Sequence, residues 1–304
     1  MDAHNIIKGP KTGTTKVKGT MKGKIDNINK KLRDLKEILL NMESVLIAYS
    51  GGVDSTFLLK VAKDVLGDKV LAVTATSLTY PSYEIEGARK MAKALRVRHL
   101  AIETSEFSNP KFISNSQDRC YWCKRELFLK LAALAKEYKL NYVLDGSNYD
   151  DIRDFRPGMK AANELGIRSP LKEARLTKDE IRNFSKGLGL PTWDKPSFAC
   201  LASRFPYGMK INKGNLIKVA RAERFLRMFG ITQVRVRHHD KIARIEVLEE
   251  DIPKLLEEKL RRQVTSYFKK LGYVYVAVDL KGYRTGSMNE VLKGADKKDE
   301  TDIP

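Results

Sequence analysis

Residues 46–56 read LIAYSGGVDST, an apolar run of β character that passes through Ser-Gly-Gly into a helix predicted over about 55–66. Gly51 and Gly52 can adopt backbone angles that other residues avoid, so their N–H groups can converge on an anion. The N-terminus of the following helix directs its dipole and free amides at the same place. These features predict a phosphate-binding loop, with a plain strand-to-helix turn as the alternative.

The polar side chains of this loop suit a nucleotide. Ser50, Ser55 and Thr56 supply hydroxyl donors, whereas the Asp54 carboxylate would repel phosphate and fits better as a Mg²⁺ ligand or an organiser of the loop. The loop lacks the Gly-Lys-Ser/Thr ending of a Walker motif, which argues against ordinary γ-phosphate hydrolysis. The string SGGVDST resembles instead the PP-loop of ATP pyrophosphatases. Those enzymes cleave ATP to AMP and pyrophosphate and so activate a carbonyl or carboxyl oxygen as an adenylate.

Length and composition indicate a globular protein of two domains. The chain has 304 residues, 42% of them hydrophobic, and no apolar run approaches the roughly 18 residues that cross a bilayer. We therefore expect a cytoplasmic protein without a membrane partner. Three cysteines do not suit a disulfide framework and are free for metals or chemistry in a reducing compartment. The net charge of +19 would suit ATP, another small anionic substrate or RNA.

Strand and helix patterns alternate after the loop. The predicted strands lie at 70–76, 99–102 and 142–144, and the predicted helices lie at about 25–39, 82–95, 121–139 and 178–187. The last of these begins with Thr177-Lys178-Asp179-Glu180, which has the spacing of a capping box. Alternation of this kind predicts an α/β fold whose parallel sheet is flanked by helices and binds ligands beyond the carboxyl ends of its strands.

A smaller α/β domain is predicted to follow. A proline-containing connection over 190–209 shows little periodicity, and beyond it a helix is predicted at 213–229, strands at 233–238 and 241–247, a helix at about 252–271 and a strand at 273–280. The predicted division is a disordered basic leader at 1–25, a PP-loop domain at 26–192, a C-terminal sulfur-transfer or substrate domain at 193–290 and a flexible tail at 291–304.

Loops at the carboxyl ends of the predicted strands supply further candidates. Thr76 ends one strand and is expected to face the nucleotide. Asp145 follows another strand and is expected either to face ATP or Mg²⁺ or to form an Asx turn. Arg156, beside Pro157, could hold a phosphate or a carboxylate through two parallel hydrogen bonds.

The three cysteines form a second group of candidates. Cys120 and Cys123 lie at ligand spacing near the start of a predicted helix, where the helix dipole would lower a thiol pKa, and Cys200 lies in the connection between the domains. Three thiolates could hold a 4Fe-4S cluster with one open iron, or a zinc ion with His238 or His239 as the fourth ligand. They could also be buried small residues without a metal.

Arginines lie near Cys200 and on the predicted C-terminal hairpin. Arg204, four residues after Cys200, is expected to bind a phosphate or carboxylate of the substrate, with a surface ion pair as the alternative. Arg235, Arg237 and Arg244 could form a basic floor for the substrate or a solvated face.

Taken together, five motifs resemble the LarE family, the ATP-dependent sulfur transferases that build the nickel-pincer cofactor of lactate racemase. They are the PP-loop, DGSNYDDIRDFRPG at 145–158, SPLKEA at 169–174, KPSFACLASRFPYG at 195–208 and RVRHHDKIARIEV at 235–247. The resemblance runs from about residue 27 to 290. It implies that a carboxylate of pyridinium-3,5-biscarboxylic acid mononucleotide attacks the α-phosphorus of ATP, and that a sulfur nucleophile then displaces AMP to leave a thiocarboxylate.

The resemblance also implies roles for particular residues. Cys200 corresponds to the sulfur-donating cysteine, which in one-cysteine members gives up its sulfur and becomes dehydroalanine. The presence of Cys120 and Cys123 is the pattern of three-cysteine members thought to bind a 4Fe-4S cluster and take sulfur from added sulfide. We accordingly expect Asp54, Cys200 and Arg204 to be catalytic, ATP, Mg²⁺ and the cluster to be cofactors, and the protein to be a homo-oligomer that acts on a small anionic mononucleotide.

Other functions share part of this pattern. A tRNA thiolation enzyme would share the PP-loop, adenylation and a three-cysteine cluster, but such enzymes generally carry extra zinc-binding CxxC pairs or a separate RNA-binding domain. An amide-forming PP-loop ligase would need neither the CxxC pair nor Cys200. A non-catalytic nucleotide sensor or RNA-binding protein would need neither an intact SGGVDS nor a group of thiols. Nucleic acid is therefore not the expected partner.

Overall fold

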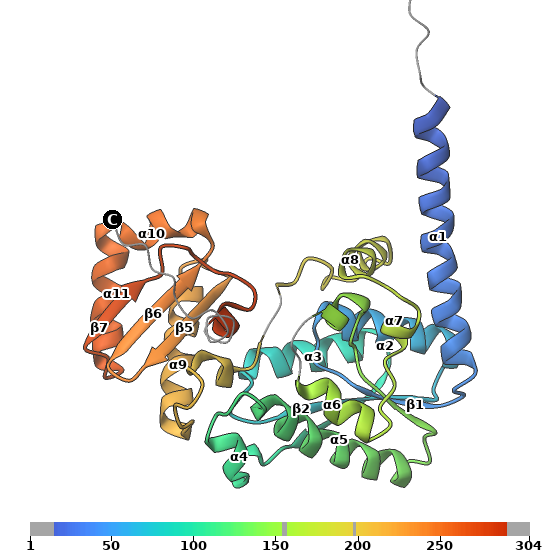
Figure 1. Cartoon of the computed structure of the whole chain (residues 1–304), viewed down its shortest axis with the longest axis horizontal. Coiled ribbons are helices and arrows are strands. Elements are labelled where there is room, and N and C mark those ends of the chain that lie inside the picture. The colour runs from blue at the N-terminus through green and yellow to red at the C-terminus, as the bar shows by residue number, and fades with distance from the viewer. Residues whose placement is uncertain (1–14, 154–156, 197–198, 291–304) are drawn as a thin grey trace, which may run out of the picture.

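The computed structural model describes residues 15–153, 157–196 and 199–290 of the 304-residue chain, with side chains from residue 26 onward. The first sheet has four strands in the order β3-β2-β1-β4, all parallel (Figure 1). Its strands are β1 Val45–Ala48, β2 Val70–Thr76, β3 Arg98–Glu103 and β4 Tyr142–Leu144. The predicted α/β fold with a parallel PP-loop sheet is confirmed.

Alternation along β1 decides which layer each of its residues enters. Val45 and Ile47 pack into one core with helices α2 (Val53–Leu66) and α8 (Lys178–Gly187), whereas Leu46 packs on the other face with α5 (Arg119–Glu137). Because both faces are covered, the strand reads as an unbroken apolar run. The phosphate-binding loop therefore leaves the sheet at the carboxyl end of a central buried strand.

Several helices differ from the sequence-based expectation. Helix α1 spans Thr15–Leu40 and so begins within the stretch expected to be disordered. Short helices lie at α4 Pro110–Ile113, α6 Pro157–Glu164 and α7 Pro170–Glu173, where no helix was predicted. Each of these starts on proline, which is favourable at the first helical position, but each is too short to show a helical period. Helix α3 (Ser82–Ala94) and the capping box of α8 agree with prediction.

The second sheet is mixed and has the order β5-β6-β7. Its strands are β5 Val234–His239, β6 Ile242–Val247 and β7 Tyr275–Val278; β5 and β6 are antiparallel, and β6 and β7 are parallel. Helix α9 (Lys213–Arg227) precedes the sheet. The predicted single helix over 252–271 is wrong: Glu257 has an extended backbone (ψ 131°) that separates α10 (Ile252–Leu256) from α11 (Glu258–Lys270).

The connection between the two sheets lies against the first domain. The Leu201 N–H donates to the Thr79 carbonyl (2.8 Å), and the Ile211 N–H donates to the Ile113 carbonyl (2.9 Å). Residues Leu201–Arg204 form one turn of 3₁₀ helix in a stretch predicted to be extended. The described part of the connection is therefore fixed by backbone hydrogen bonds, and Cys200 is held immediately before a short turn of helix.

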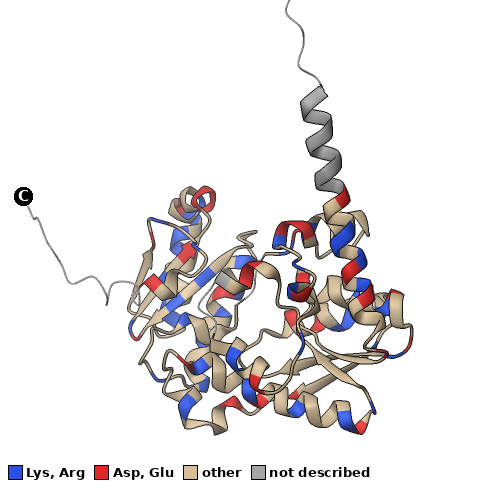
Figure 2. Ribbon diagram, turned by 45° about the vertical axis from the view of Figure 1, so that its right-hand side comes forward, with Lys and Arg blue, Asp and Glu red and all other residues tan. Residues whose placement is uncertain are grey.

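Surface charge and membrane-spanning potential were both part of the sequence-based expectation. In the view of Figure 2, Lys and Arg are interspersed with Asp and Glu over both domains and do not gather in a single basic stripe. Within the described ranges, no helix combines the length and the apolar character needed to cross a bilayer. The predicted limits of the domains, and the tail from residue 291, stay predictions.

Candidate active site

Hydroxyl groups hold the phosphate-binding loop in shape. Ser50 Oγ and Ser55 Oγ share a hydrogen bond of 3.0 Å, the Gly52 N–H donates to Ser50 Oγ (3.3 Å), and Ser55 Oγ donates to the Gly52 carbonyl (3.3 Å). The loop thus closes on itself directly before the N-terminus of α2, where free amides and the helix dipole favour an anion. This is the geometry expected of a phosphate cradle.

Two glycines let neighbouring elements approach the loop closely. Gly51 has φ +70°, and a Cβ built there would lie 2.9 Å from the Cβ of Ala88 on α3. A Cβ on Gly146, in the loop after β4, would lie 3.1 Å from the Ser55 nitrogen. Gly51 therefore requires glycine, because a side chain there would combine a positive φ with a clash, whereas a side chain at Gly146 would only press against the backbone of α2.

Gly51→Ala is expected to weaken ATP binding at least about tenfold and to destabilise the protein by about 1–3 kcal/mol, because it combines a positive φ with a clash against Ala88. Gly67→Ala is the matched control, since Gly67 has φ +60° but a Cβ added there would meet nothing within 4 Å. Calorimetric ATP titration and thermal unfolding measure both effects. Equal behaviour of the two variants would contradict the steric argument.

The acidic residue of the loop lies beside a lysine. Asp54 Oδ2 forms an ion pair of 2.5 Å with Lys178 Nζ at the start of α8, and Asn148 Nδ2 donates to Asp54 Oδ1 at 3.4 Å. The two charged side chains are about one-quarter exposed, so they remain accessible to a ligand. Asp54 is therefore held at the mouth of the cradle by residues from two other segments.

Other predicted nucleotide ligands are used differently. Thr56 is fully buried and shares a hydrogen bond with the Tyr49 hydroxyl (3.3 Å), so its side chain belongs to the core and does not face the cradle. Asp145 accepts hydrogen bonds from the Ser147 N–H (3.1 Å), the Ser147 hydroxyl (2.8 Å) and the Ser169 hydroxyl (2.7 Å). The bonds to Ser147 form an Asx turn, which was the alternative prediction for Asp145.

Thr76 and Arg156 were also predicted to contact the nucleotide. The Thr76 hydroxyl donates to the Ile102 carbonyl (3.1 Å) at the end of β2, which ties neighbouring strands together. Arg156 lies outside the described residues.

A cavity of about 80 Å³ opens beside the cradle. Its polar lining includes Ser50, Thr74, Tyr80, Glu84 and Lys124, and its apolar walls come from the strand ends and from α3 and α5. A mostly apolar cavity with a few convergent polar groups at the carboxyl end of a parallel sheet is the usual position for a nucleotide.

The three cysteines converge from two segments. Cys120 and Cys123 occupy the first turns of α5, and Cys200 precedes the 3₁₀ turn. The buried Arg119 joins these segments, because its guanidinium donates to the Ala202 carbonyl (2.9 Å) and approaches Cys120 Sγ (3.7 Å). Cys123 and Cys200 pack against the same apolar cluster.

Burial governs the acidity of these thiols. It raises the pKa of Cys123 well above the ordinary value, and the charge of Cys200 raises it further. Burial likewise raises the pKa of Cys200. The sequence-based expectation that the helix dipole would lower the thiol pKa is therefore wrong for Cys123, because loss of solvation outweighs the dipole.

The zinc alternative lacks its fourth ligand. His238 Nδ1 lies 3.1 Å from the Tyr273 hydroxyl and its ring packs against Phe205, whereas His239 lines a separate cavity. Among the described residues, no group of three or more His, Cys, Asp or Glu side chains is arranged to hold a metal ion. In the described residues, neither a Cys₃His set nor the three cysteines by themselves are arranged as a metal site.

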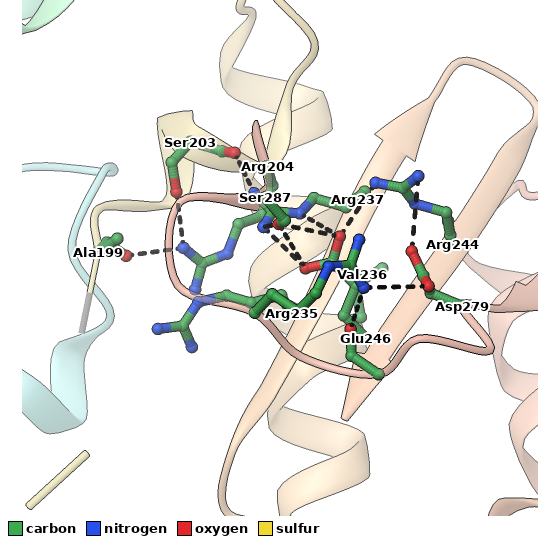
Figure 3. A network of polar contacts seen from close by, with 12 residues as sticks. Ala199, Ser203, Arg204, Arg235, Val236, Arg237, Arg244, Glu246, Asp279 and Ser287 are labelled. Carbon is green, nitrogen blue, oxygen red and sulfur yellow. Dashed lines mark hydrogen bonds and ion pairs between the residues drawn. The ribbon is translucent and has the colours of Figure 1, made fainter. Parts of the chain in front are cut away.

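Arg204 forms a buried ion pair and not the surface ion pair that was the alternative, and its expected role as a substrate ligand stays a prediction. It is fully buried, and its guanidinium pairs with both carboxylate oxygens of Glu223 on α9 (2.7 and 3.1 Å). Figure 3 shows the same side chain directed toward Ala199. Its Nη1 also donates to the carbonyl oxygens of Ala199 (2.8 Å) and Cys200 (3.2 Å). Arg204 is therefore a positioning residue that fixes the backbone of Cys200 to the second domain.

Glu223→Gln is expected to reduce the free energy of unfolding by about 3–5 kcal/mol at pH 7, because it leaves the buried Arg204 without its counter-charge. Burial alone would raise the pKa of Glu223, but the charges of Arg204 and Arg227 lower it to about 2. The carboxylate therefore stabilises the fold above its unfolded pKa of about 4.3, and this contribution is lost as the pH falls toward 2.

Urea unfolding between pH 7 and pH 3 measures that contribution. The difference between Glu223→Gln and the unsubstituted protein should shrink below about pH 4. Glu250→Gln, on an exposed site, is the control and should show little change at any pH. A deficit that does not vary with pH would contradict the assigned ion pair.

A second cavity, of about 140 Å³, is lined in part by Ser203 and Arg204 of the 3₁₀ turn that follows Cys200. Arg237 lines it and donates to the Ser203 carbonyl (2.7 Å) while pairing with both oxygens of Glu246 (2.9 and 2.7 Å). His239 Nε2 and Arg244 Nε are buried in its lining with no hydrogen-bond partner among the described residues. The predicted alternative of a solvated arginine face is wrong for Arg235 and Arg237, which are both buried.

Comparison with known proteins identifies the family. The NAD synthase family model matches residues 25–118, which contain the phosphate-binding loop. An uncharacterized protein, slr1717 of Synechocystis, is 45% identical over 87% of this chain and 99% of its own length. The pyridinium-3,5-bisthiocarboxylic acid mononucleotide synthase of Lactiplantibacillus plantarum is 38% identical over 84% of this chain and 93% of its own length. The chain belongs to the LarE family.

More distant similarity is confined to part of the chain. The glutamine-hydrolyzing GMP synthase of Chlamydia caviae is 25% identical over 60% of this chain and 38% of its own length. For this LarE-family chain, the predicted family, the PP-loop fold and the class of ATP-dependent sulfurtransferase are confirmed.

Sequence reasoning missed the lysines of the site. Lys195, which opens the Cys200 motif (residues 195–208), donates to the Gly51 carbonyl (3.0 Å) and pairs with Glu84 on α3 (2.6 Å). Lys178 pairs with Asp54, and Lys124 lines the first cavity. In a chain with 57 Lys and Arg residues, no local pattern separates these lysines from those on the surface. Two features of the sequence could have indicated them: Lys195 is part of the Cys200 motif, and Lys124 directly follows the CxxC pair.

Proposed function

We propose that this protein adenylates a carboxylate of pyridinium-3,5-biscarboxylic acid mononucleotide with ATP, releases pyrophosphate, and converts the adenylate to a thiocarboxylate with release of AMP. The name of the Lactiplantibacillus relative gives the bisthiocarboxylic product, and sulfur at two carboxyl positions requires both to be activated. A carboxylate resists substitution until one oxygen becomes a leaving group, and adenylation supplies that leaving group.

One arrangement carries the proposal: the Cys200 motif is tied to the phosphate-binding loop at its start and lines the second cavity further along. On one side Lys195 joins the motif to the phosphate-binding loop through the Gly51 carbonyl (3.0 Å). On the other side Arg237 holds the Ser203 carbonyl (2.7 Å) at the wall of the second cavity. The proposal is that a substrate anchored in the second cavity presents its carboxyl group toward ATP at the phosphate-binding loop, because the motif that carries Cys200 connects the two places.

The second cavity suits the phosphate of the mononucleotide. Its lining combines Arg237, Arg244 and His239, and two of their nitrogens are buried without a partner among the described residues. Arg244 Nε is a buried donor, and His239 Nε2 is one in the tautomer that carries its proton there; buried donors without partners are costly, and a phosphate oxygen would satisfy them. Arg204 is not proposed as a substrate ligand, because its donors are already used by Glu223 and by backbone carbonyls.

Asp54 is the proposed Mg²⁺ ligand. Its carboxylate lies at the mouth of the cradle, where it pairs with Lys178, and a carboxylate oxygen is a hard donor that suits Mg²⁺, which would take the place of the ammonium. Mg²⁺, when bound, would neutralise charge on the phosphates that leave as pyrophosphate. Ser50, Gly51, Gly52 and Ser55 are the proposed phosphate contacts.

Cys120, Cys123 and Cys200 are the proposed ligands of a 4Fe-4S cluster. They are three free thiols, the soft donors that such a cluster needs, and they would have to move together to hold it, because the described residues contain no preformed metal site. The cluster, when bound, would offer one iron without a protein ligand, where hydrosulfide could bind. Sacrificial donation of the Cys200 sulfur, with conversion to dehydroalanine, is the alternative for protein without the cluster. A cytoplasmic homo-oligomer remains the expectation.

The test is ATP–pyrophosphate exchange in the presence of candidate acceptors. We expect exchange to depend on pyridinium-3,5-biscarboxylic acid mononucleotide and to be absent with bulk tRNA. Exchange that requires tRNA, followed by thiolated nucleosides in the digest, would replace the proposal with the tRNA-thiolation alternative. Exchange with neither acceptor would reject both.

A further inference from the structure

Lys124 lies beside both Cys123 and the first cavity, the cavity of about 80 Å³ next to the phosphate-binding loop, which is called the nucleotide cavity below. It directly follows Cys123 on α5, and its side chain lines the same cavity as Ser50 of the phosphate-binding loop. Tyr80 lines that cavity too; burial raises its pKa well above the ordinary value, and the three cysteines and Glu106 are near enough to add to that effect. The cavity and the thiols are thus immediate neighbours, and Lys124 is a cation between them.

The Lys124 ammonium has no acidic partner among the residues that the structure describes. Nζ lies 5.1 Å from the ring centroid of Phe128, which offers only a weak cation–π contact. Lys178 and Lys195, two other lysines at the site, are both in ion pairs, at 2.5 and 2.6 Å. A half-buried ammonium without a counter-charge is poorly solvated, so an anion in the cavity would be attracted strongly.

The stem of Lys124 is fixed in direction. A Cβ built on Gly158, at the start of α6, would lie 2.9 Å from Lys124 Cγ, so α6 packs directly onto the stem. Burial is the largest influence on the pKa of Cys123 and raises it, whereas the Lys124 charge acts to lower it. The ammonium is therefore close enough to act on groups at both the cavity and the thiols.

We propose that Lys124 is a catalytic residue that binds the α-phosphoryl group of ATP and then of the acyl-adenylate. This inference rests on the proposed function. In the first step a carboxylate oxygen bonds to the α-phosphorus as pyrophosphate leaves. In the second step a sulfur lone pair forms the C–S bond, the C–O bond breaks, and its electron pair remains on the AMP phosphate, where Lys124 offsets the added charge.

The first test needs no pyridinium substrate. Lys124→Gln should weaken AMP binding about tenfold in calorimetry and leave adenosine binding unchanged, because only the phosphate contact is lost. Lys124→Arg should recover most of the affinity. Lys136→Gln, an exposed position on the same helix, is the matched control. Equal losses for AMP and adenosine, or no loss for either, would overturn the inference.

The second test uses the full reaction. Lys124→Gln should slow ATP–pyrophosphate exchange about 10²-fold or more in kcat, and Gly158→Ala, which displaces the stem, should show a smaller loss. Thermal unfolding should show all variants folded. Unchanged exchange in Lys124→Gln would overturn this inference alone, whereas absent exchange in the unsubstituted protein would overturn the proposed function and leave the AMP result to stand by itself.

Discussion

Cys200→Ser is expected to abolish thiocarboxylate formation, by more than about 10³-fold, while ATP–pyrophosphate exchange stays within a few-fold of normal. The physical reason is that the two half-reactions use different groups. The phosphate-binding loop, Asp54 and the nucleotide cavity belong to the first domain, whereas Cys200 lies on the connection that follows it. A hydroxyl keeps the size of the side chain but is a far weaker nucleophile and metal ligand than a thiolate.

Mass spectrometry of the product measures sulfur transfer, and the exchange assay measures adenylation. Cys120→Ser and Cys123→Ser are the companion variants, because they remove a thiol without touching the motif that Arg204 and Lys195 position. Under the three-cysteine proposal, neither variant should form more than one thiocarboxylate per chain. Undiminished thiocarboxylate from Cys200→Ser would remove this residue from the sulfur-transfer step.

Asp54→Ala is expected to lower ATP–pyrophosphate exchange by about 10³-fold, because the loop would lose the carboxylate proposed to hold Mg²⁺ and the charge of the leaving pyrophosphate would not be neutralised. The fold should persist. Asp54 and Lys178 form a partly exposed ion pair, and pairs of that kind contribute only about 0–1 kcal/mol.

Asp64→Asn is the matched control for that variant. Asp64 lies on the same helix and pairs with Lys60 (2.7 Å) at an exposed position away from the loop. Its exchange rate should be normal, and both variants should unfold near the temperature of the unsubstituted protein. Near-normal exchange in Asp54→Ala would exclude Asp54 from catalysis.

Periodicity was enough to predict the elements that carry the phosphate-binding loop. The strand at Val70–Thr76 has the predicted limits, and the loop between β1 and α2 lies where Ser-Gly-Gly indicated. The limits of a strand and the position of a glycine turn depend on neighbouring residues, so they can be predicted from a single sequence. Short helices such as Pro170–Glu173 were missed because four residues do not complete two helical turns.

Side-chain roles were harder to predict because they depend on partners far away in sequence. The partner of Arg204 is Glu223, nineteen positions away on α9, and the partner of Lys178 is Asp54. Asp145 looked equally suited to Mg²⁺ and to an Asx turn, but hydroxyl groups from two other residues occupy its oxygens. Burial of Cys123 reversed the expected direction of its pKa. None of these contacts leaves a local signature.

Sulfur is expected to pass through the three-thiol site to an adenylated carboxylate without consuming Cys200. The most direct test is an anaerobic reaction of the intact protein with Mg-ATP, pyridinium-3,5-biscarboxylic acid mononucleotide and isotopically labelled sulfide, with mass spectrometry of both product and protein. We predict labelled thiocarboxylate in excess of one per chain, AMP in equal amount, and a protein of unchanged mass. Unlabelled product that never exceeds one sulfur per chain, with a protein lighter by the mass of H₂S, would contradict the account.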